Sequence, residues 1–369
     1  PMPDVLYRLH GSETSVTGAV FPLLETKLHA PRRRQGIVTR PRLRARLDHR
    51  EQPALTVVAA PAGFGKTTLV AEWFADGPAT AWLSLDASDN EPTLFWTYLI
   101  AALQTVEPDV GADARALLQV PQFDIDAVVA MLLNDLQAVA HDLVLVLDDY
   151  HAIESPEIHQ TVSFLVDHLP AHVHLVIASR ADPPLPLASL RAGGHLLEYR
   201  AADLAITAAE ATAYLNDEMG LAVTASDIEM LEARTEGWIA ALQLAALSMR
   251  DREDVTAFIA GFAGDDRFVL DYLVGEVLER QGEDIRSFLL ETSVLNRLTG
   301  PLCDAVTGRP GGRITLEHLY RSNLFLVPLD DRRPWARHHP PFAYMLHARP
   351  PPDPPLPAPH PPARPRAGP

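Results

Sequence analysis

Residue types suited to holding a phosphate group follow one another in one short segment. It reads Ala-Pro-Ala-Gly-Phe-Gly-Lys-Thr over Ala60–Thr67. Gly63 and Gly65 let the backbone come close to a ligand, so that amide N–H groups can face phosphate oxygens. Lys66 supplies a cation for the β- and γ-phosphates, and the Thr67 hydroxyl can ligate Mg²⁺. The predicted nucleotide contacts are Ala60, Pro61, Ala62, Gly63, Phe64, Gly65, Lys66, Thr67 and Thr68.

The segment's surroundings distinguish a phosphate-binding loop from an ordinary glycine-rich turn. An apolar run of strand length, Leu55–Ala60, precedes it, and a helical pattern with Leu69, Val70 and Trp73 on one face follows it. A helix that begins at Lys66 would direct its unpaired amides and the positive end of its dipole at an anion. Loop and context together predict a P-loop.

Two adjacent carboxylates form the second candidate group. Asp148 and Asp149 follow the apolar run Leu143–Leu147, which would deliver them to the carboxyl edge of a parallel sheet, where the loop also lies. Asp148 is expected to hold Mg²⁺ directly or through water. Asp149 is expected to orient or deprotonate an attacking water. The alternative is that both aspartates cap the next helix.

Arg180 and a group of histidines complete the candidates. Arg180 follows the apolar run His174–Ala178 and is interpreted as a sensor of the γ-phosphate, the alternative being an ordinary surface arginine. Three histidines near the C-terminus suggest a metal site, but no cysteine joins them and their spacing matches no zinc pattern. A metal site is therefore not predicted at His338, His339 and His347.

The elements that must position these residues alternate along the chain. Besides the three runs above, Ala79–Leu85 reads as a strand. Helical patterns lie between the strands, at Thr93–Leu103, Val128–Ala138 and Ile158–Leu169. Unbroken apolar strands alternating with helices predict an α/β fold, a parallel sheet wrapped by helices.

Beyond about Leu204 helices are expected, with one short strand after the helix in Ile314–Leu329. The two patterns Thr207–Glu210 and Thr224–Asp227 resemble capping boxes. We therefore expect a small helical domain and then a winged-helix-like domain. The expected domains are an N-terminal extension over 1–19, a P-loop ATPase domain over 20–200, a helical domain over 201–250, a winged-helix-like domain over 251–347 and a disordered proline-rich tail over 348–369.

Composition limits the partners. The net charge is −17 over 369 residues, so the chain as a whole is a poor DNA binder. A basic stretch, Pro31–Arg46, is interpreted as a solvated segment near the nucleotide site. No apolar run approaches the roughly 18 residues of a membrane helix. The single cysteine, Cys303, rules out an intramolecular disulfide, and a cytoplasmic location is expected.

Several stretches resemble one family, the signal-transduction ATPases with numerous domains (STAND), and within it the MalT-type regulators of the LuxR group. The resemblance lies in Leu24–Leu28 with Arg40–Leu43, Ala60–Thr68, Trp82–Asn90, Leu145–His151, Ala178–Asp182, Gly237–Leu244 and Asn323–Asp330. It implies an ATP- and ADP-binding switch with Mg²⁺, closed with ADP and opened by an inducer and ATP. The open form is expected to self-associate.

The resemblance also assigns residues. It implies that Val38 and Arg40 lie near the base and ribose, that Gly237-Trp238 covers the nucleotide, and that His338 or His339 contacts the β-phosphate in the resting form. Family members continue into a helical-repeat sensor and a C-terminal helix-turn-helix that binds DNA. Neither is seen in this sequence, so DNA contact is expected only through a C-terminal domain absent from this chain.

The sequence suggests three alternative functions. The first is an ATP-binding, slowly hydrolysing switch module of a transcriptional regulator, with ATPase activity itself left open. The second is a truncated ADP-binding remnant without an ATPase cycle, which the prolines around His338 and His339 favour. The third, a small-molecule kinase or a transporter subunit, lacks an ABC-type signature and a second substrate motif. No membrane partner is expected.

Overall fold

The computed structural model describes residues 23–31, 38–48, 53–75, 77–250, 252, 254–262, 266–329 and 335–349. The expected N-terminal extension, the arginines at 32–34 and all but two residues of the expected tail lie outside this part.

A parallel five-stranded sheet forms the core of the first domain. Its strands are β1 (Leu55–Ala59), β2 (Ala79–Ser84), β3 (Leu143–Asp148), β4 (Val173–Ser179) and β5 (Leu196–Arg200), in the order β2-β3-β4-β1-β5. The predicted α/β class is therefore confirmed. The sequence interpretation missed β5, an edge strand in which buried residues alternate with the half-buried Glu198 and Arg200.

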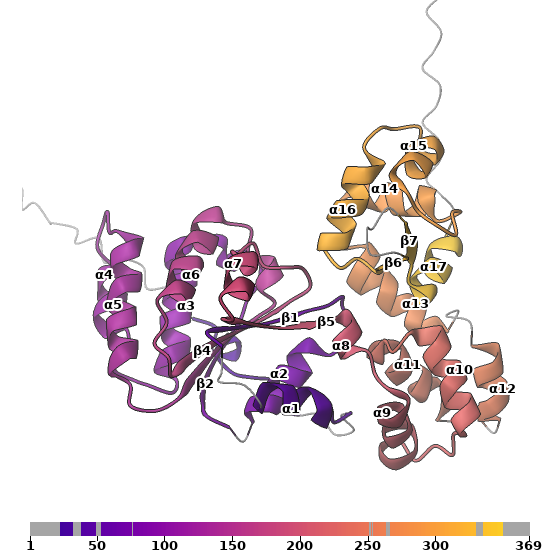
Figure 1. Ribbon diagram of the computed structural model, residues 1–369, viewed down its shortest axis with the longest axis horizontal. Helices are drawn as coiled ribbons and strands as arrows, with labels where there is room; N and C mark the ends of the chain where they lie inside the picture. The colour runs from indigo at the N-terminus through magenta and orange to yellow at the C-terminus, as the bar shows by residue number, and fades with distance from the viewer. Residues whose placement is uncertain are drawn as a thin grey trace, which may run out of the picture.

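Helices cover both faces of the sheet (Figure 1). One face carries α3 (Pro92–Gln104), α5 (Ile125–Ala138), α6 (Pro156–Asp167) and α7 (Leu187–Ala192), and the other carries α1 (Pro41–Asp48) and α2 (Lys66–Phe74). Along β1, Val57 faces the first layer and Val58 the second, because successive side chains of a strand point to opposite faces. Each strand therefore contributes to two separate apolar cores.

Shorter elements connect these layers. α4 (Ala112–Leu117) packs on α5, and three short 3₁₀ helices occur at η1 (Glu25–Leu28), η2 (Ala87–Asn90) and η3 (Tyr150–Ala152). Lys27 of η1 places its ammonium 2.6 Å from a carboxylate oxygen of Asp89, which is fully buried in η2. This buried ion pair ties the start of the described chain to the sheet domain.

Helices alone build the next part of the chain. They are α8 (Ala201–Leu204), α9 (Ala208–Thr212), the π-helix η4 (Ala213–Glu218), α10 (Ala225–Thr235), α11 (Ile239–Met249), α12 (Val255–Gly261) and α13 (Arg267–Leu273). Both expected capping boxes are present, at Thr207 with Glu210 and at Thr224 with Asp227. Because α12 packs on α10 and α13 on α11, the helical layer extends past residue 250.

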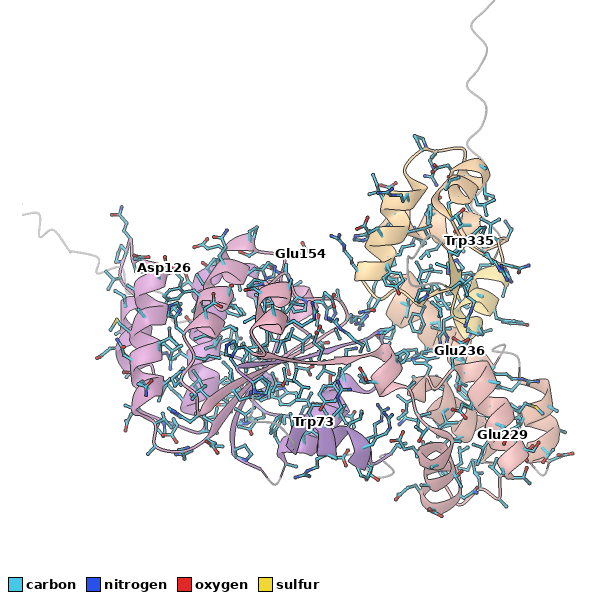
Figure 2. The ribbon with its side chains drawn as sticks, viewed as in Figure 1. Trp73, Asp126, Glu154, Glu229, Glu236 and Trp335 are labelled. Atoms are coloured by element: carbon cyan, nitrogen blue, oxygen red, sulfur yellow. The ribbon has the colours of Figure 1, made fainter. Side chains whose placement is uncertain are left out.

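A winged-helix arrangement follows. It comprises the π-helix η5 (Val274–Leu278), α14 (Glu283–Thr292), α15 (Gly300–Thr307), α16 (Gly312–Arg321), the antiparallel strands β6 (Leu326–Pro328) and β7 (Ala336–His338), and α17 (Pro340–His347). The two helical parts meet near Glu236, which pairs with Arg337 of β7 (Figure 2). In the described part of the chain, no helix is long and apolar enough to cross a membrane.

Candidate nucleotide-binding site

The predicted phosphate loop connects the end of β1 to the start of α2. Gly63 and Gly65 have φ angles of 77° and 74°, in the left-handed region that side chains disfavour. A Cβ atom on Gly63 would lie 2.7 Å from both Ala240 Cβ and Trp238 Nε1. Glycine is therefore required at position 63 by conformation and by the close approach of α11.

A cavity of about 340 Å³ opens beside this loop. Of the residues predicted from sequence, Val38, Arg40, Ala62, Gly63, Gly65, Lys66, Thr67, Thr68, Asp149 and Arg180 line it. Ala60, Pro61 and Phe64 belong to the loop but do not line the cavity. The structure thus brings the loop, one carboxylate and the candidate sensor arginine to one space.

Lys66 lies at the inner end of the loop. Its ammonium donates hydrogen bonds to the carbonyl oxygens of Ala60 and Pro61, at 2.8 and 2.9 Å. Burial, and then the nearby charge of Arg180, lower the pKa of Lys66 to about 8. The loop therefore carries a buried lysine ammonium beside its inward-facing backbone, an arrangement suited to an anion.

Thr67 and Asp148 form a pair suited to a hard cation. The Thr67 hydroxyl donates a hydrogen bond of 3.0 Å to Asp148 Oδ1, and Asp148 is 3% exposed. Burial, and then the adjacent Asp149 carboxylate, raise the pKa of Asp148 to about 7. A cation would offset this cost of burying a carboxylate, and Mg²⁺ in proteins is held by one or two carboxylates together with phosphate oxygens. The described residues contain no cluster of three or more metal-binding His, Cys, Asp or Glu side chains, so Thr67 and Asp148 would hold the ion together with a phosphate.

Asp149 occupies a strained position at the end of β3. Its φ is 56°, unusual for a residue with a side chain, and its amide donates to Asp148 Oδ1 at 3.1 Å. Its carboxylate is 48% exposed, lies 3.8 Å from His151 Nδ1 and faces the cavity. Burial lowers the pKa of His151 to about 3, which leaves that imidazole neutral at pH 7. Asp149 is thus a cavity-facing carboxylate with water access.

Residues from the helical domain close the other side of the cavity. The indole of Trp238 donates to the Ala62 carbonyl at 3.0 Å, and the Ala240 amide donates to the Gly63 carbonyl at 3.1 Å. Further lining residues that the sequence interpretation missed are Leu69, Glu72, Ile239, Ala240, Gln243 and Tyr272. The resemblance at Gly237-Trp238 pointed to this contact, but no motif or spacing marked Tyr272, some two hundred residues beyond the loop.

Comparison with known proteins shows which proteins the chain is similar to. Residues 274–355 match the family described as the MalT winged helix domain. Proteins named "HTH-type transcriptional regulator MalT" are 38% identical in Yersinia enterocolitica and 39% identical in Serratia proteamaculans, each over 332 residues and 89% of this chain. The chain is therefore related to the MalT-type regulators. It spans 36% of the length of these two relatives.

A solved structure supports the fold of this chain. A Walker-type ATPase of Pyrococcus abyssi superposes with a TM-score of 0.58, over 84% of this chain and 96% of that one. The two are 15% identical, so the likeness concerns the fold alone. The P-loop architecture is thus found by topology, by loop geometry and by structural comparison.

The two histidines that the resemblance placed at a phosphate do not reach the cavity. His338 and His339 are each 5% exposed, do not line the cavity, and have ring nitrogens without hydrogen-bond partners. Aromatic side chains surround them, Phe342 beside His338 and Trp238 beside His339. The cavity's arrangement therefore gives no support to a phosphate contact from His338.

The basic stretch near the N-terminus makes contacts within the chain. Arg40, which is buried, donates to the Leu204 carbonyl at 2.8 Å, Arg42 to Glu210 at 2.9 Å, and Arg46 to Asp203 at 2.7 Å. These arginines attach α1 to α8 and α9. Within the described residues, these contacts join the sheet domain to the helical domain.

Proposed function

We propose that this chain is the ATP-binding, slowly hydrolysing switch module of a MalT-type regulator of the LuxR group. One observation carries the proposal: the phosphate-loop cavity is shared between domains. The sheet domain contributes Lys66, Thr67 and Arg180, whereas the helical layer contributes Ala240 and Tyr272. A ligand in this cavity contacts both domains, so its identity can favour one domain arrangement over another.

Each site residue has a proposed role. The amides of Gly63–Thr67 and the Lys66 ammonium bind phosphate, and Thr67 with Asp148 holds Mg²⁺, which would neutralise phosphate charge. Asp149 orients the attacking water, and Arg180 contacts the terminal phosphate. Val38 and Arg40, which also line the cavity, are assigned to the base and ribose. The preference for adenine follows from the resemblance to MalT-type proteins.

Slow hydrolysis suits a switch, because a long-lived bound state is what holds one arrangement. In this proposal the ATP form self-associates. The relatives are called helix-turn-helix regulators, and this chain spans about a third of their length. We assign promoter contact to residues outside this chain. The sheet domain is proposed to span 20–200, and the limit between the helical and winged-helix domains is proposed to lie beyond residue 250, because α12 and α13 pack on the helical layer.

The test is nucleotide content and turnover of the purified protein. Wild type is expected to carry adenine nucleotide, identified by chromatography, and to release phosphate slowly with Mg²⁺. Lys66→Ala is expected to lose binding by at least about tenfold, since it removes a buried phosphate ligand. Asp149→Asn is expected to keep binding and to lose turnover. Arg321→Ala, on the exposed side of α16, is the control and should behave as wild type.

The outcomes separate the proposed functions. Slow phosphate release with binding supports the switch module, and sedimentation with an ATP analogue then measures self-association. Bound ADP without turnover supports the ADP-binding remnant instead. A folded wild-type protein that binds neither ATP nor ADP would overturn both.

A further inference from the structure

Arg180, the candidate sensor of the terminal phosphate, already has a partner from the C-terminal part of the chain. Its guanidinium donates to the Glu276 carbonyl oxygen at 3.0 Å and lies 3.4 Å from the Glu276 carboxylate. Both groups are only partly exposed, at 25% and 38%. We infer that Glu276 sets nucleotide selectivity by competing with a terminal phosphate for Arg180, so that this arrangement favours a nucleoside diphosphate over a triphosphate.

The position of Glu276 in the fold explains the contact. It lies in the π-helix η5, which continues α13 directly, and Figure 1 shows α13 between the helical bundle and the winged-helix hairpin. A π-helical turn widens the helix and redirects its side chains, and such turns are frequent at functional sites. Tyr272, one turn earlier, lines the nucleotide cavity. The turn that follows it therefore places Glu276 at the edge of the same site.

The competition follows from the hydrogen-bonding capacity of arginine. A guanidinium presents its N–H donors in a rigid planar fork and pairs with either a carboxylate or a phosphate through parallel bonds. The donors that Arg180 directs to Glu276 are then not available to a terminal phosphate. A diphosphate, which ends nearer the loop, does not need them. A triphosphate must break the pair or leave its terminal phosphate less well bound.

Two further contacts hold this arrangement. The Glu276 carboxylate also accepts from Arg280 at 2.8 Å, so it keeps a cationic partner when Arg180 leaves. The side-chain amide of Asn323 donates to the Arg180 carbonyl at 2.9 Å, which attaches the end of β4 to the winged-helix domain. The contacts of Arg180 with Glu276 and Asn323 join the sensor arginine to residues beyond 270. A phosphate bound to Arg180 would therefore alter the contacts between the sheet domain and the winged-helix domain.

This inference rests on the proposed function, and the experiment separates the two. Dissociation constants for ADP and for a non-hydrolysable ATP analogue, both with Mg²⁺, are measured by calorimetry on the full chain. Glu276→Gln removes the competing charge at constant size. We expect the affinity for the ATP analogue relative to ADP to rise about 1.5- to fivefold, the range for a partly exposed ion pair.

Matched variants isolate the contact from a general charge effect. Glu279→Gln makes the same charge change on an exposed position of the next turn, and it should leave the ratio of the two affinities unchanged. In an Arg180→Gln background, Glu276→Gln should no longer change the ratio of the two affinities. The guanidinium for which Glu276 and the terminal phosphate compete is then absent. If the Glu276 charge instead acted on the third phosphate directly, Glu276→Gln would still change the ratio in that background.

Each result decides between the two claims. An unchanged ratio in Glu276→Gln, or an equal rise in the Arg180→Gln background, overturns the selectivity role while nucleotide binding by wild type leaves the proposed function standing. If wild type binds neither nucleotide, both the selectivity role and the proposed function are overturned. If Glu276→Gln melts at a markedly lower temperature, Glu276→Asp, which shortens the reach to Arg180, supplies the same comparison with the charge kept.

Discussion

Gly63 is the residue at which backbone conformation and domain contact are most closely linked. Its φ of 77° disfavours any side chain, and a Cβ atom there would collide with Ala240 and Trp238. Gly194 has nearly the same φ, 75°, but nothing lies within 4 Å of its Cβ position. Substitutions at Gly63 and Gly194 therefore separate the effect of backbone strain from the effect of a steric collision.

We predict that Gly63→Ala lowers the free energy of unfolding by about 2–4 kcal/mol, and Gly194→Ala by only about 1 kcal/mol. The difference arises because only the first substitution pushes α11 from the loop. Urea denaturation of both variants measures it. Equal losses would show that α11 does not press on the loop in solution.

At the scale of the element, two buried imidazoles lie at the junction of the strand β7 and the helix α17. Burial, and then the charge of His347, lower the pKa of His338 to about 4, while burial and then Arg337 lower that of His339 to about 3. Glu236 lies 3.8 Å from His339 and is the acidic group facing it. Both rings are therefore neutral in the folded protein at pH 7.

These two histidines predict acid sensitivity. Unfolded histidine binds a proton near pH 6.5, so the unfolded chain takes up protons first as pH falls, and stability present above pH 6.5 is lost progressively towards pH 4. From pH 7.5 to 5.5 each histidine should cost about 1.4 kcal/mol of unfolding free energy. His338→Leu should reduce the difference in unfolding free energy between pH 7.5 and pH 5.5 by about that amount.

Urea titrations at both pH values measure this difference. The exposed His318 of α16 provides the control, since His318→Gln should leave the pH dependence as in wild type. An unchanged dependence in His338→Leu would mean that His338 is protonated, or solvated, in the folded state.

At the scale of the whole molecule, the cavity joins parts of the chain that are far apart in sequence. Because a ligand that contacts the loop, α11 and α13 stabilises all three, we predict that ADP slows amide exchange in each of them. At about 100 times the dissociation constant the stabilisation is about 2.7 kcal/mol, or roughly a hundredfold in exchange by global opening. Hydrogen-exchange mass spectrometry measures it, with Lys66→Ala as the control. Protection confined to 53–75 would contradict a cavity shared between domains.

The sequence by itself determined four strands of the sheet and which candidate residues lie at its carboxyl edge. Leu55–Ala59, Leu143–Leu147 and the loop between β1 and α2 were predictable because buried parallel strands are apolar throughout and phosphate loops need glycine at fixed places. Asp148, Asp149 and Arg180 followed from strand ends, since parallel strands bring their carboxyl ends to one edge. The edge strand β5 was not predicted, because its alternating polar residues resemble a loop.

Only the tertiary structure decided what faces that edge. Tyr272 and Glu276 come from helices whose sequence carries no nucleotide motif, and they reach the site because α13 packs on α11. His338 lies away from the cavity because its ring is enclosed by the apolar core of the winged-helix domain. Short-range patterns fix local conformation, whereas contacts between distant segments depend on how the domains pack, which no spacing in the sequence records.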